Sequence, residues 1–154
     1  MPTRFYRAGV GTVVYRPTGE IVIFKRSQHP VGAWELQQGG IDLGEVPEQT
    51  LWRELLEEIG VVQDDIEHYE MMPRQTMYQS PLAADSSVPV LGQVHYWFFL
   101  KLKNDREINL ENALEDEASD FRWTSFDQLI SLAGDHKKHV YETLRDYFKQ
   151  NILK

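Results

Sequence analysis

The sequence contains no cysteine, and this absence removes a whole set of chemistries. A chain without thiols forms no disulfide, offers no thiolate to a metal ion and has no cysteine nucleophile. The composition fits the reducing environment of the cytoplasm. We therefore expect a cytoplasmic protein.

Long hydrophobic runs are also missing from the 154 residues. Residues 1–15 include Arg4 and Arg7 but no uninterrupted apolar core of a signal peptide. No other stretch approaches the roughly 20 apolar residues that a membrane helix needs. We expect a soluble, unprocessed protein without a membrane partner. Its length and its 42% of hydrophobic residues predict a single domain over residues 1–154.

Positive charge is scarce: 16 Lys and Arg residues face 24 Asp and Glu residues, for a net charge of −8. Proteins that bind nucleic acid through a broad electrostatic surface are normally basic, so this mode of binding is not expected. A polyanionic substrate would need cations as intermediaries. Scattered acids are explained by solubility alone, but acids concentrated on one helix face are not.

Short β-branched and aromatic runs predict several strands. Residues 9–15 and 21–24, separated by turn formers, predict a β-hairpin. Trp97 and Trp123 lie inside strand patterns and are assigned to the core. Further strands are expected over residues 94–102 and 121–124 and around residues 75–78. The segments between them are predicted to be irregular: residues 27–44, 73–92 and 104–120.

Flanking residues define one helix clearly. Pro47 suits a first helical turn and Gly60 suits the left-handed residue after a helix end, which predicts a helix over residues 47–59. A helical turn is expected over residues 126–132. Apolar residues at helical spacing predict a C-terminal amphipathic helix over about residues 138–153.

The helix over residues 47–59 carries three carboxylates, Glu54, Glu57 and Glu58, on one narrow arc. Apolar residues occupy the arc beside and behind them: Leu51, Leu55, Leu56 and Ile59. The acids should therefore point away from the core. Their mutual repulsion favours a hard divalent cation, Mg²⁺ or Mn²⁺, which prefers several oxygen ligands. A solvated helix face is the alternative, and for an isolated pattern it would be preferred.

The pattern is not isolated, because a glycine-rich loop precedes it. Gly39, five residues, Glu45, seven residues and then RELLEEIGV over residues 53–61 resemble a complete Nudix box. The resemblance implies an α/β/α sandwich with a mixed central sheet and a catalytic loop and helix. It also implies metal-dependent hydrolysis of a nucleoside diphosphate linkage, with Mg²⁺ or Mn²⁺ as the cofactor.

The resemblance assigns roles within this box. The resemblance implies four metal ligands: the side chains of Glu54, Glu57 and Glu58 and the backbone carbonyl of Gly39. Arg53 and Glu45 would orient the loop and the helix. Glu57 is the first choice for the general base, and Glu117 is the second. Glu117 resembles a distant glutamate, just before a strand that ends in Arg-Trp, which some relatives use as ligand or base; it is equally one acid among several in its segment.

Outside the box, the chain is similar to the bacterial RNA pyrophosphohydrolase and dinucleoside polyphosphate hydrolase branch of the family. Four motifs carry this similarity: YRAGVG at 6–11, WELQQGGID at 34–42, YWFF at 96–99 and KKHVY at 137–141. Gln37 departs from the pattern, because that branch usually has proline there. The long segment 77–92 is a second departure.

The branch implies three hypotheses for function. The first is conversion of 5′-triphosphate RNA ends to 5′-monophosphate ends for decay, and the nearest alternative is hydrolysis of a dinucleoside polyphosphate of the diadenosine tetraphosphate type. A non-catalytic nucleotide-binding regulator usually has a decayed box, whereas this box is intact. By resemblance, five residues are candidates for contact with the RNA or nucleoside polyphosphate: Arg7, Arg26, Gln38, Lys137 and, by stacking, Tyr78. Each of the charged ones also fits an ordinary surface position, and Tyr78 also fits a packing position.

Overall fold

The computed structural model describes residues 3–27 and 34–153. Residues 28–33, part of the predicted loop 27–44, lie outside the described residues. The strands are β1 (Phe5–Tyr15), β2 (Ile21–Arg26), β3 (Trp34–Glu35), β4 (Gln38–Gly40), β5 (Ile66–Met71), β6 (Thr76–Gln79), β7 (Val90–Leu102) and β8 (Ala118–Thr124).

The helices lie between and after these strands. They are α1 (Pro47–Ile59), α2 (Phe126–Leu132) and α3 (Asp135–Tyr147), with a π-helical segment at Phe148–Ile152 and short 3₁₀ turns at Gln63–Asp65, Pro81–Ala84 and Leu110–Asn112. Within the described part of the chain, no helix combines the length and the apolar character needed to cross a membrane.

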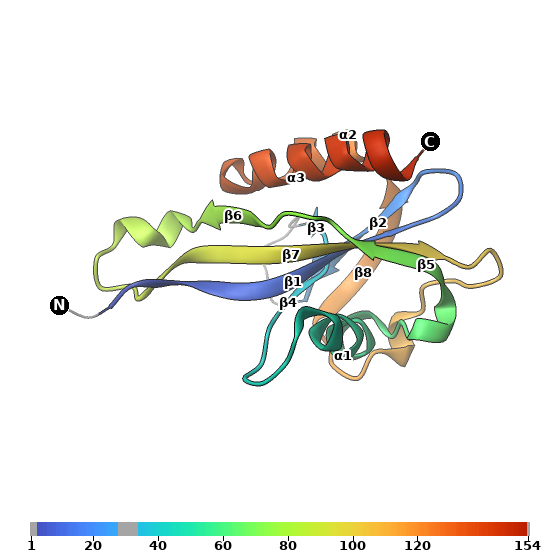
Figure 1. The fold of residues 1–154 in the computed structure, drawn as a ribbon, viewed down its shortest axis with the longest axis horizontal. Helices are drawn as coiled ribbons and strands as arrows, with labels where there is room; N and C mark the ends of the chain where they lie inside the picture. The colour runs from blue at the N-terminus through green and yellow to red at the C-terminus, as the bar shows by residue number, and fades with distance from the viewer. Residues whose placement is uncertain (1–2, 28–33, 154) are drawn as a thin grey trace.

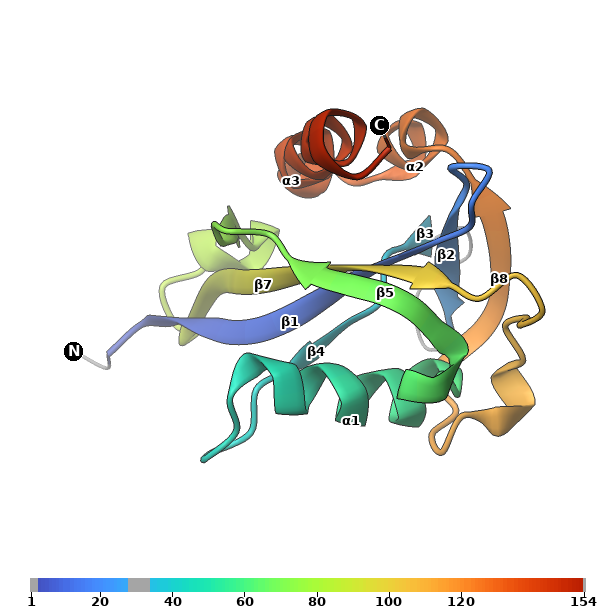
Figure 2. The same cartoon turned by 45° about the vertical axis from the view of Figure 1, so that its right-hand side comes forward.

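The strands form one mixed sheet (Figure 1). β1 runs parallel to β7, from Phe5 beside Val90 to Tyr15 beside Lys101, and the other strand pairs are antiparallel. Helix α1 lies against one face of the sheet, and α2 and α3 lie against the other (Figure 2). The predicted α/β/α sandwich with a mixed central sheet is confirmed.

Helices cover both faces of the sheet, and successive side chains of a strand point to opposite faces. Neighbouring residues of one strand are therefore buried in different cores. Along β7, Trp97 and Phe99 join the core beneath α2 and α3. Phe98 and Leu100, which alternate with them, join the core against α1. This burial on two faces explains why β7 reads as a continuous apolar run in the sequence.

Helix α1 begins and ends where the sequence predicts. Pro47 is its first residue, and Gly60 follows its last residue with a φ of 72°, in the left-handed region. Leu51, Leu55 and Ile59 are buried against the sheet. The prediction of a helix over residues 47–59 is confirmed.

The predicted hairpin is confirmed only next to its turn, where Tyr15 pairs with Ile21. Farther from the turn the two strands separate, since β1 pairs with β4 and β2 pairs with β3 along the edges that face each other. The prediction of an irregular segment over residues 27–44 is wrong in its second half, which contains β3 and β4. These strands are two and three residues long, too short to leave a pattern of their own.

The remaining elements differ from their predictions mainly at their boundaries. β7 begins four residues before the predicted strand 94–102, β8 begins three residues before 121–124, and α3 begins three residues before 138. Trp97 is 1% exposed, as predicted for the core. Trp123 is only partly buried against the core. The guanidinium of Arg16 lies over its ring, 3.9 Å from the ring centre.

Candidate active site

The glycine-rich loop meets helix α1 where Gly39 passes directly over Glu54. Strand β4 pairs with β1, with Gly39 beside Val10, and this pairing places the loop above the helix. A Cβ atom on Gly39 would lie 2.1 Å from the carboxyl carbon of Glu54. Only glycine permits this approach, so any other residue here would displace the carboxylate.

Arg53 joins the loop to the helix through all three nitrogens of its guanidinium. Its Nε and Nη2 donate to the two oxygens of Glu45 at 2.7 and 2.8 Å, and Nη2 also donates to the Gly40 carbonyl at 2.9 Å. Nη1 donates to Glu54 at 2.8 Å and to Glu57 at 3.2 Å. The hydrogen bonds from Arg53 lower the pKa of Glu45 to about 2. Arg53 and Glu45 therefore lie between the loop and the helix, where the resemblance placed them.

Acidic side chains gather around a hollow of about 350 Å³ beside α1. Three come from the helix and two from the segment before β8: Glu54, Glu57, Glu58, Glu115 and Glu117. Burial raises the pKa of Glu54, and burial followed by contact with Glu117 raises the pKa of Glu58. The charge of Glu57 raises the pKa of Glu115. Carboxylates that repel one another in this way favour a cation between them.

The prediction that all three helix acids point away from the core is wrong for Glu54. This residue is 9% exposed, because the loop at Gly39 covers it. The side chain of Glu57 is 25% exposed and borders the hollow. Glu54 is therefore held by its surroundings more firmly than a solvated acid would be.

The residues of this hollow fit a hard divalent cation, since carboxylate and carbonyl oxygens are the ligands that Mg²⁺ prefers. Among residues 3–27 and 34–153, no three His, Cys, Asp or Glu side chains already stand together as a ligand set. Arg53 binds one oxygen of Glu54 and one of Glu57. The second oxygen of each carboxylate takes no part in these bonds with Arg53, and a cation would bind to it.

A second hollow, of about 360 Å³, adjoins the first and is lined by cationic and polar side chains. All five residues predicted to contact substrate line it: Arg7, Arg26, Gln38, Tyr78 and Lys137. Arg7, Arg26 and Gln38 line both hollows. The ring of Tyr78 is mostly buried, with His136 at 5.5 Å between ring centres. The fold thus brings together residues that are up to 130 positions apart in the sequence, Arg7 and Lys137.

Glu35 holds two of these cations, and the sequence analysis did not identify it. Its Oε1 lies 3.3 Å from Arg26, and its Oε2 accepts a hydrogen bond from Lys137 at 2.9 Å. Arg26 also lies 3.8 Å from Glu117, which links the two hollows. The sequence did contain a sign of this role, since Glu35 stands between the apolar residues Trp34 and Leu36. A charged side chain in such a position needs an oppositely charged partner when it is buried.

His95 is a second residue that the sequence analysis missed. It is 1% exposed and borders the acidic hollow from β7, packed over Gly9. Burial, followed by the charge of Lys137, lowers its pKa to about 4. His95 is therefore neutral at pH 7. A histidine within the apolar run of β7 was its only mark in the sequence.

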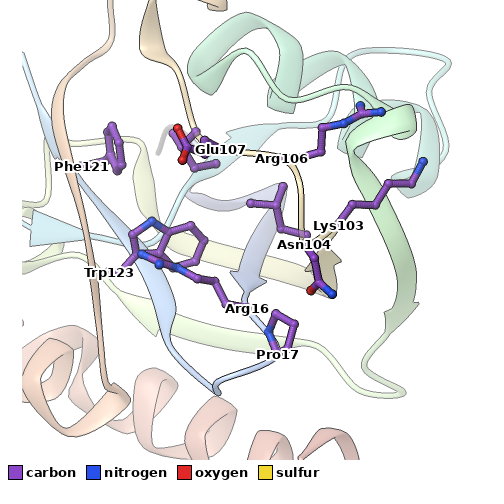
Figure 3. A pocket seen from close by; sticks show the side chains of 10 residues that line it. Arg16, Pro17, Lys103, Asn104, Arg106, Glu107, Phe121 and Trp123 are labelled. Atoms are coloured by element: carbon purple, nitrogen blue, oxygen red, sulfur yellow. The ribbon is translucent and has the colours of Figure 1, made fainter.

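A third hollow, of about 260 Å³, shares no residue with the acidic one (Figure 3). Arg16, Lys103 and Arg106 lie around it with Trp123. Its cations are matched by nearby acids: Arg106 contacts Asp64 and Asp65, and Lys103 contacts Asp64. The third hollow also includes none of the acids of α1, so we do not assign it to the site.

A family model, described as the NUDIX domain, matches residues 5–147. The chain belongs to the Nudix family. The Nudix box thus supplies the α1 acids and the glycines of the acidic hollow, and Nudix hydrolases in general depend on divalent cations.

Relatives and solved structures agree with this assignment. An RNA pyrophosphohydrolase of Pseudoalteromonas translucida (strain TAC 125) is 35% identical over 148 residues, which are 93% of this chain and 84% of the relative. The structure of the E. coli dihydroneopterin triphosphate pyrophosphohydrolase aligns with a TM-score of 0.71 at 20% identity, over 93% of this chain and 99% of that one. A C. elegans Ap4A hydrolase aligns with a TM-score of 0.67 at 18% identity, over 93% and 98%. These two structures support the Nudix fold of this chain, and the chain is a Nudix hydrolase.

Proposed function

We propose that this Nudix hydrolase removes pyrophosphate from the 5′-triphosphate end of RNA and leaves a 5′-monophosphate end that is open to decay. The junction of the two hollows carries the proposal, because Arg7, Arg26 and Gln38 border both the acids and the cationic side. A triphosphate laid across this junction would place its reacting phosphorus over the acids and its nucleoside side toward Lys137. The name of the relative from Pseudoalteromonas supports RNA as the substrate.

In the proposed reaction, a water oxygen attacks phosphorus and the bond to the bridging oxygen of the departing pyrophosphate breaks. Glu57 accepts the proton of the water, and Glu117 is the second candidate for this role. Divalent cations, when bound, neutralise phosphoryl charge and lower the pKa of water. Arg53 keeps the loop and the helix together and does not contact the substrate.

The chain's own residues would hold the cation and the substrate. We propose Mg²⁺ as the cation, with Mn²⁺ as a substitute, held by Glu54, Glu57 and Glu58, with Glu117 and the Gly39 carbonyl as further ligands. Arg7, Arg26 and Lys137 would contact phosphates, since arginine and lysine bind phosphate oxygens strongly. Gln38 would contact a phosphate or a base edge. Tyr78 lines the cationic hollow, but it is only 9% exposed and its ring stacks on His95, so we expect it to border the first bases and not to stack on them. We place this activity in the cytoplasm, in a single domain over residues 1–154.

Hydrolysis of a dinucleoside polyphosphate is the competing function within the family. The likeness to the C. elegans Ap4A hydrolase favours it only at the level of the fold, since that identity is 18%. A regulator without catalysis is disfavoured because the acids of the Nudix box are all present and the three on α1 face one hollow.

A competition between substrates tests the proposal. The purified protein with Mg²⁺ is given 5′-triphosphorylated RNA and diadenosine tetraphosphate together, and the pyrophosphate and ATP released are measured. We expect a higher kcat/KM for the RNA, because the cationic hollow can accept the nucleotides beyond the triphosphate. A higher kcat/KM for the dinucleotide would transfer the function to nucleotide hydrolysis, and turnover of neither would reject a catalytic role for these substrates.

A further inference from the structure

Gln37 lies buried between strand β1 and the acids of α1, and its side chain connects the two. Its residue exposure is 4%, and that of Thr12 on β1 is 2%. The Thr12 hydroxyl donates to Gln37 Oε1 at 2.8 Å, and Gln37 Nε2 donates to Glu58 Oε2 at 2.8 Å. The backbone N–H of Thr12 also donates to the carbonyl of Gln37 at 2.9 Å, which fixes the position of the main chain.

The chemistry of these three groups allows one arrangement of the amide. Glu58 would be ionised when it binds a cation, and an ionised carboxylate only accepts hydrogen bonds, so the amide turns its NH₂ group toward Glu58 as the structure has it. Its oxygen then faces Thr12, whose hydroxyl is able to donate to it. The carboxylate therefore decides which end of the amide faces it, and the bond from the Thr12 hydroxyl holds the amide in that position.

Glu58 needs such a partner, because its other neighbours in the hollow repel it. Glu54 and Glu117 both approach it as acids. Arg53 donates to Glu54 and Glu57, and Glu58 receives no hydrogen bond from it. Gln37 is thus the neutral donor that holds Glu58 among like charges. Proline, which is usual at this position in the similar branch, has no side-chain donor and could not do so.

We propose that Gln37 is a positioning residue that holds the Glu58 carboxylate for cation binding, with the Thr12 hydroxyl holding the Gln37 amide in place. The inference rests on the proposed function, in which Glu58 is a cation ligand. Gln37 itself contacts neither the cation nor the RNA in this arrangement. Loss of the amide would leave Glu58 free to rotate away from its neighbours, so cation affinity would fall while substrate contacts stay intact.

The test measures Mn²⁺ binding directly, by electron paramagnetic resonance of the free ion, together with kcat, KM and the melting temperature. Gln37→Met keeps the length of the side chain and removes the amide, and Thr12→Val removes only the hydroxyl. We expect Gln37→Met to weaken Mn²⁺ binding by about 10- to 100-fold, as is typical for residues that orient metal ligands. Thr12→Val should weaken it less, and Thr12→Ser, which keeps the hydroxyl, should restore it.

Two further readouts separate positioning from a general structural role. At saturating Mn²⁺, KM for the RNA should stay at its wild-type value, because neither residue touches the substrate. The double variant should bind Mn²⁺ no more weakly than Gln37→Met alone, since both changes break one chain of hydrogen bonds. Lower melting temperatures with unchanged Mn²⁺ affinity would overturn the inference.

The outcomes also separate this inference from the proposed function. If the wild type binds Mn²⁺ and processes RNA while both single variants bind Mn²⁺ equally well, only the inference is wrong. If the wild type neither binds Mn²⁺ nor processes RNA, the proposed function is wrong and the inference falls with it. Should Gln37→Met fail to fold, Thr12→Val decides alone, because it exchanges one buried hydroxyl for a methyl group.

Discussion

At the scale of single residues, the site consists of charges and polar groups that each serve several partners. Arg53 binds the loop and two helix acids, and Glu35 binds two cations of the neighbouring hollow. His95 stands apart, because it is buried without a charge and its Nδ1 has no hydrogen-bond partner among the described residues. Burial at this site therefore lowers the pKa of the imidazole, which is neutral at pH 7.

This exclusion makes stability depend on pH in a defined window. Burial lowers the pKa of His95 to about 4 in the folded protein, against an ordinary value near 6.5. Between these values the unfolded chain takes up a proton that the folded chain does not, so the free energy of unfolding falls as pH falls from about 6.5 to about 4. Below about 4 both states are protonated and this contribution stops changing. A shift of this size corresponds to roughly 3 kcal/mol.

Urea unfolding of the wild type and His95→Gln at several pH values between 7.5 and 4 measures this effect. The variant has no imidazole to titrate, so its stability should fall less steeply over this window. The comparison removes the contribution of the acids, which both proteins share. Curves that run parallel from pH 7.5 to 4 would show that His95 is not buried as a neutral group.

The Nudix box acids could be predicted from the sequence because their spacing on one helix fixes their common face. Glu35, Gln37 and His95 could not be assigned roles in this way. Glu35 bonds to Lys137, Gln37 bonds to Thr12, and His95 borders the acidic hollow. Only the folded sheet brings these groups together. Gln37 was noticeable as a departure from a pattern, but its bond to Glu58 depends on the approach of two separate elements.

At the scale of elements, helix α1 was predictable at both ends and the short strands beside it were not. Pro47 and Gly60 favour a helix start and a helix end through their own backbone geometry, so these positions can be predicted from the sequence alone. β3 and β4 exist because β2 and β1 offer them hydrogen bonds, and a run of two or three residues has no preference of its own. The predicted hairpin likewise opens because β3 pairs with β2 and β4 pairs with β1, along the strand edges that would otherwise pair with each other.

Gly60 gives the clearest stability test at this scale. Its φ of 72° is unfavourable for other residues by roughly 1–2 kcal/mol. A Cβ would also lie 2.7 Å from the backbone carbonyl carbon of Asn112. We expect Gly60→Ala to lower the free energy of unfolding by more than the backbone conformation alone explains, because α1 must shift away from that turn.

Denaturation of Gly60→Ala and Gly40→Ala side by side measures this. Gly40 is a matched control for stability, since a Cβ there meets nothing within 4 Å. Gly40→Ala should unfold close to the wild type. Equal stability of the two variants would mean that the end of α1 tolerates a side chain and that the packing against Asn112 is looser than the structure indicates.

At the scale of the whole molecule, charge is divided between two adjoining hollows. The chain carries a net charge of −8, yet Arg7, Arg26 and Lys137 converge beside the acids of α1. A protein of this net charge has no broad attraction for the RNA backbone, so we expect recognition of the proposed substrate to be confined to its 5′ end. The sandwich places the acidic hollow where β4, α1 and the segment before β8 meet, and the cationic hollow beside it, among residues of β1, β6, β7 and α3.

The most direct test of this account is the 5′ end of RNA after reaction with Mg²⁺. Triphosphorylated RNA is incubated with the wild type, with Glu57→Gln and with Glu142→Gln, an exposed acid on α3 that serves as the control. The fraction of 5′-monophosphate ends is then measured by digestion with a nuclease that requires them. We predict rapid conversion by the wild type and Glu142→Gln, and a rate about 10²- to 10⁴-fold lower for Glu57→Gln, because its amide cannot accept the proton of the attacking water. Triphosphate ends left intact by the wild type, or full activity of Glu57→Gln, would contradict the account.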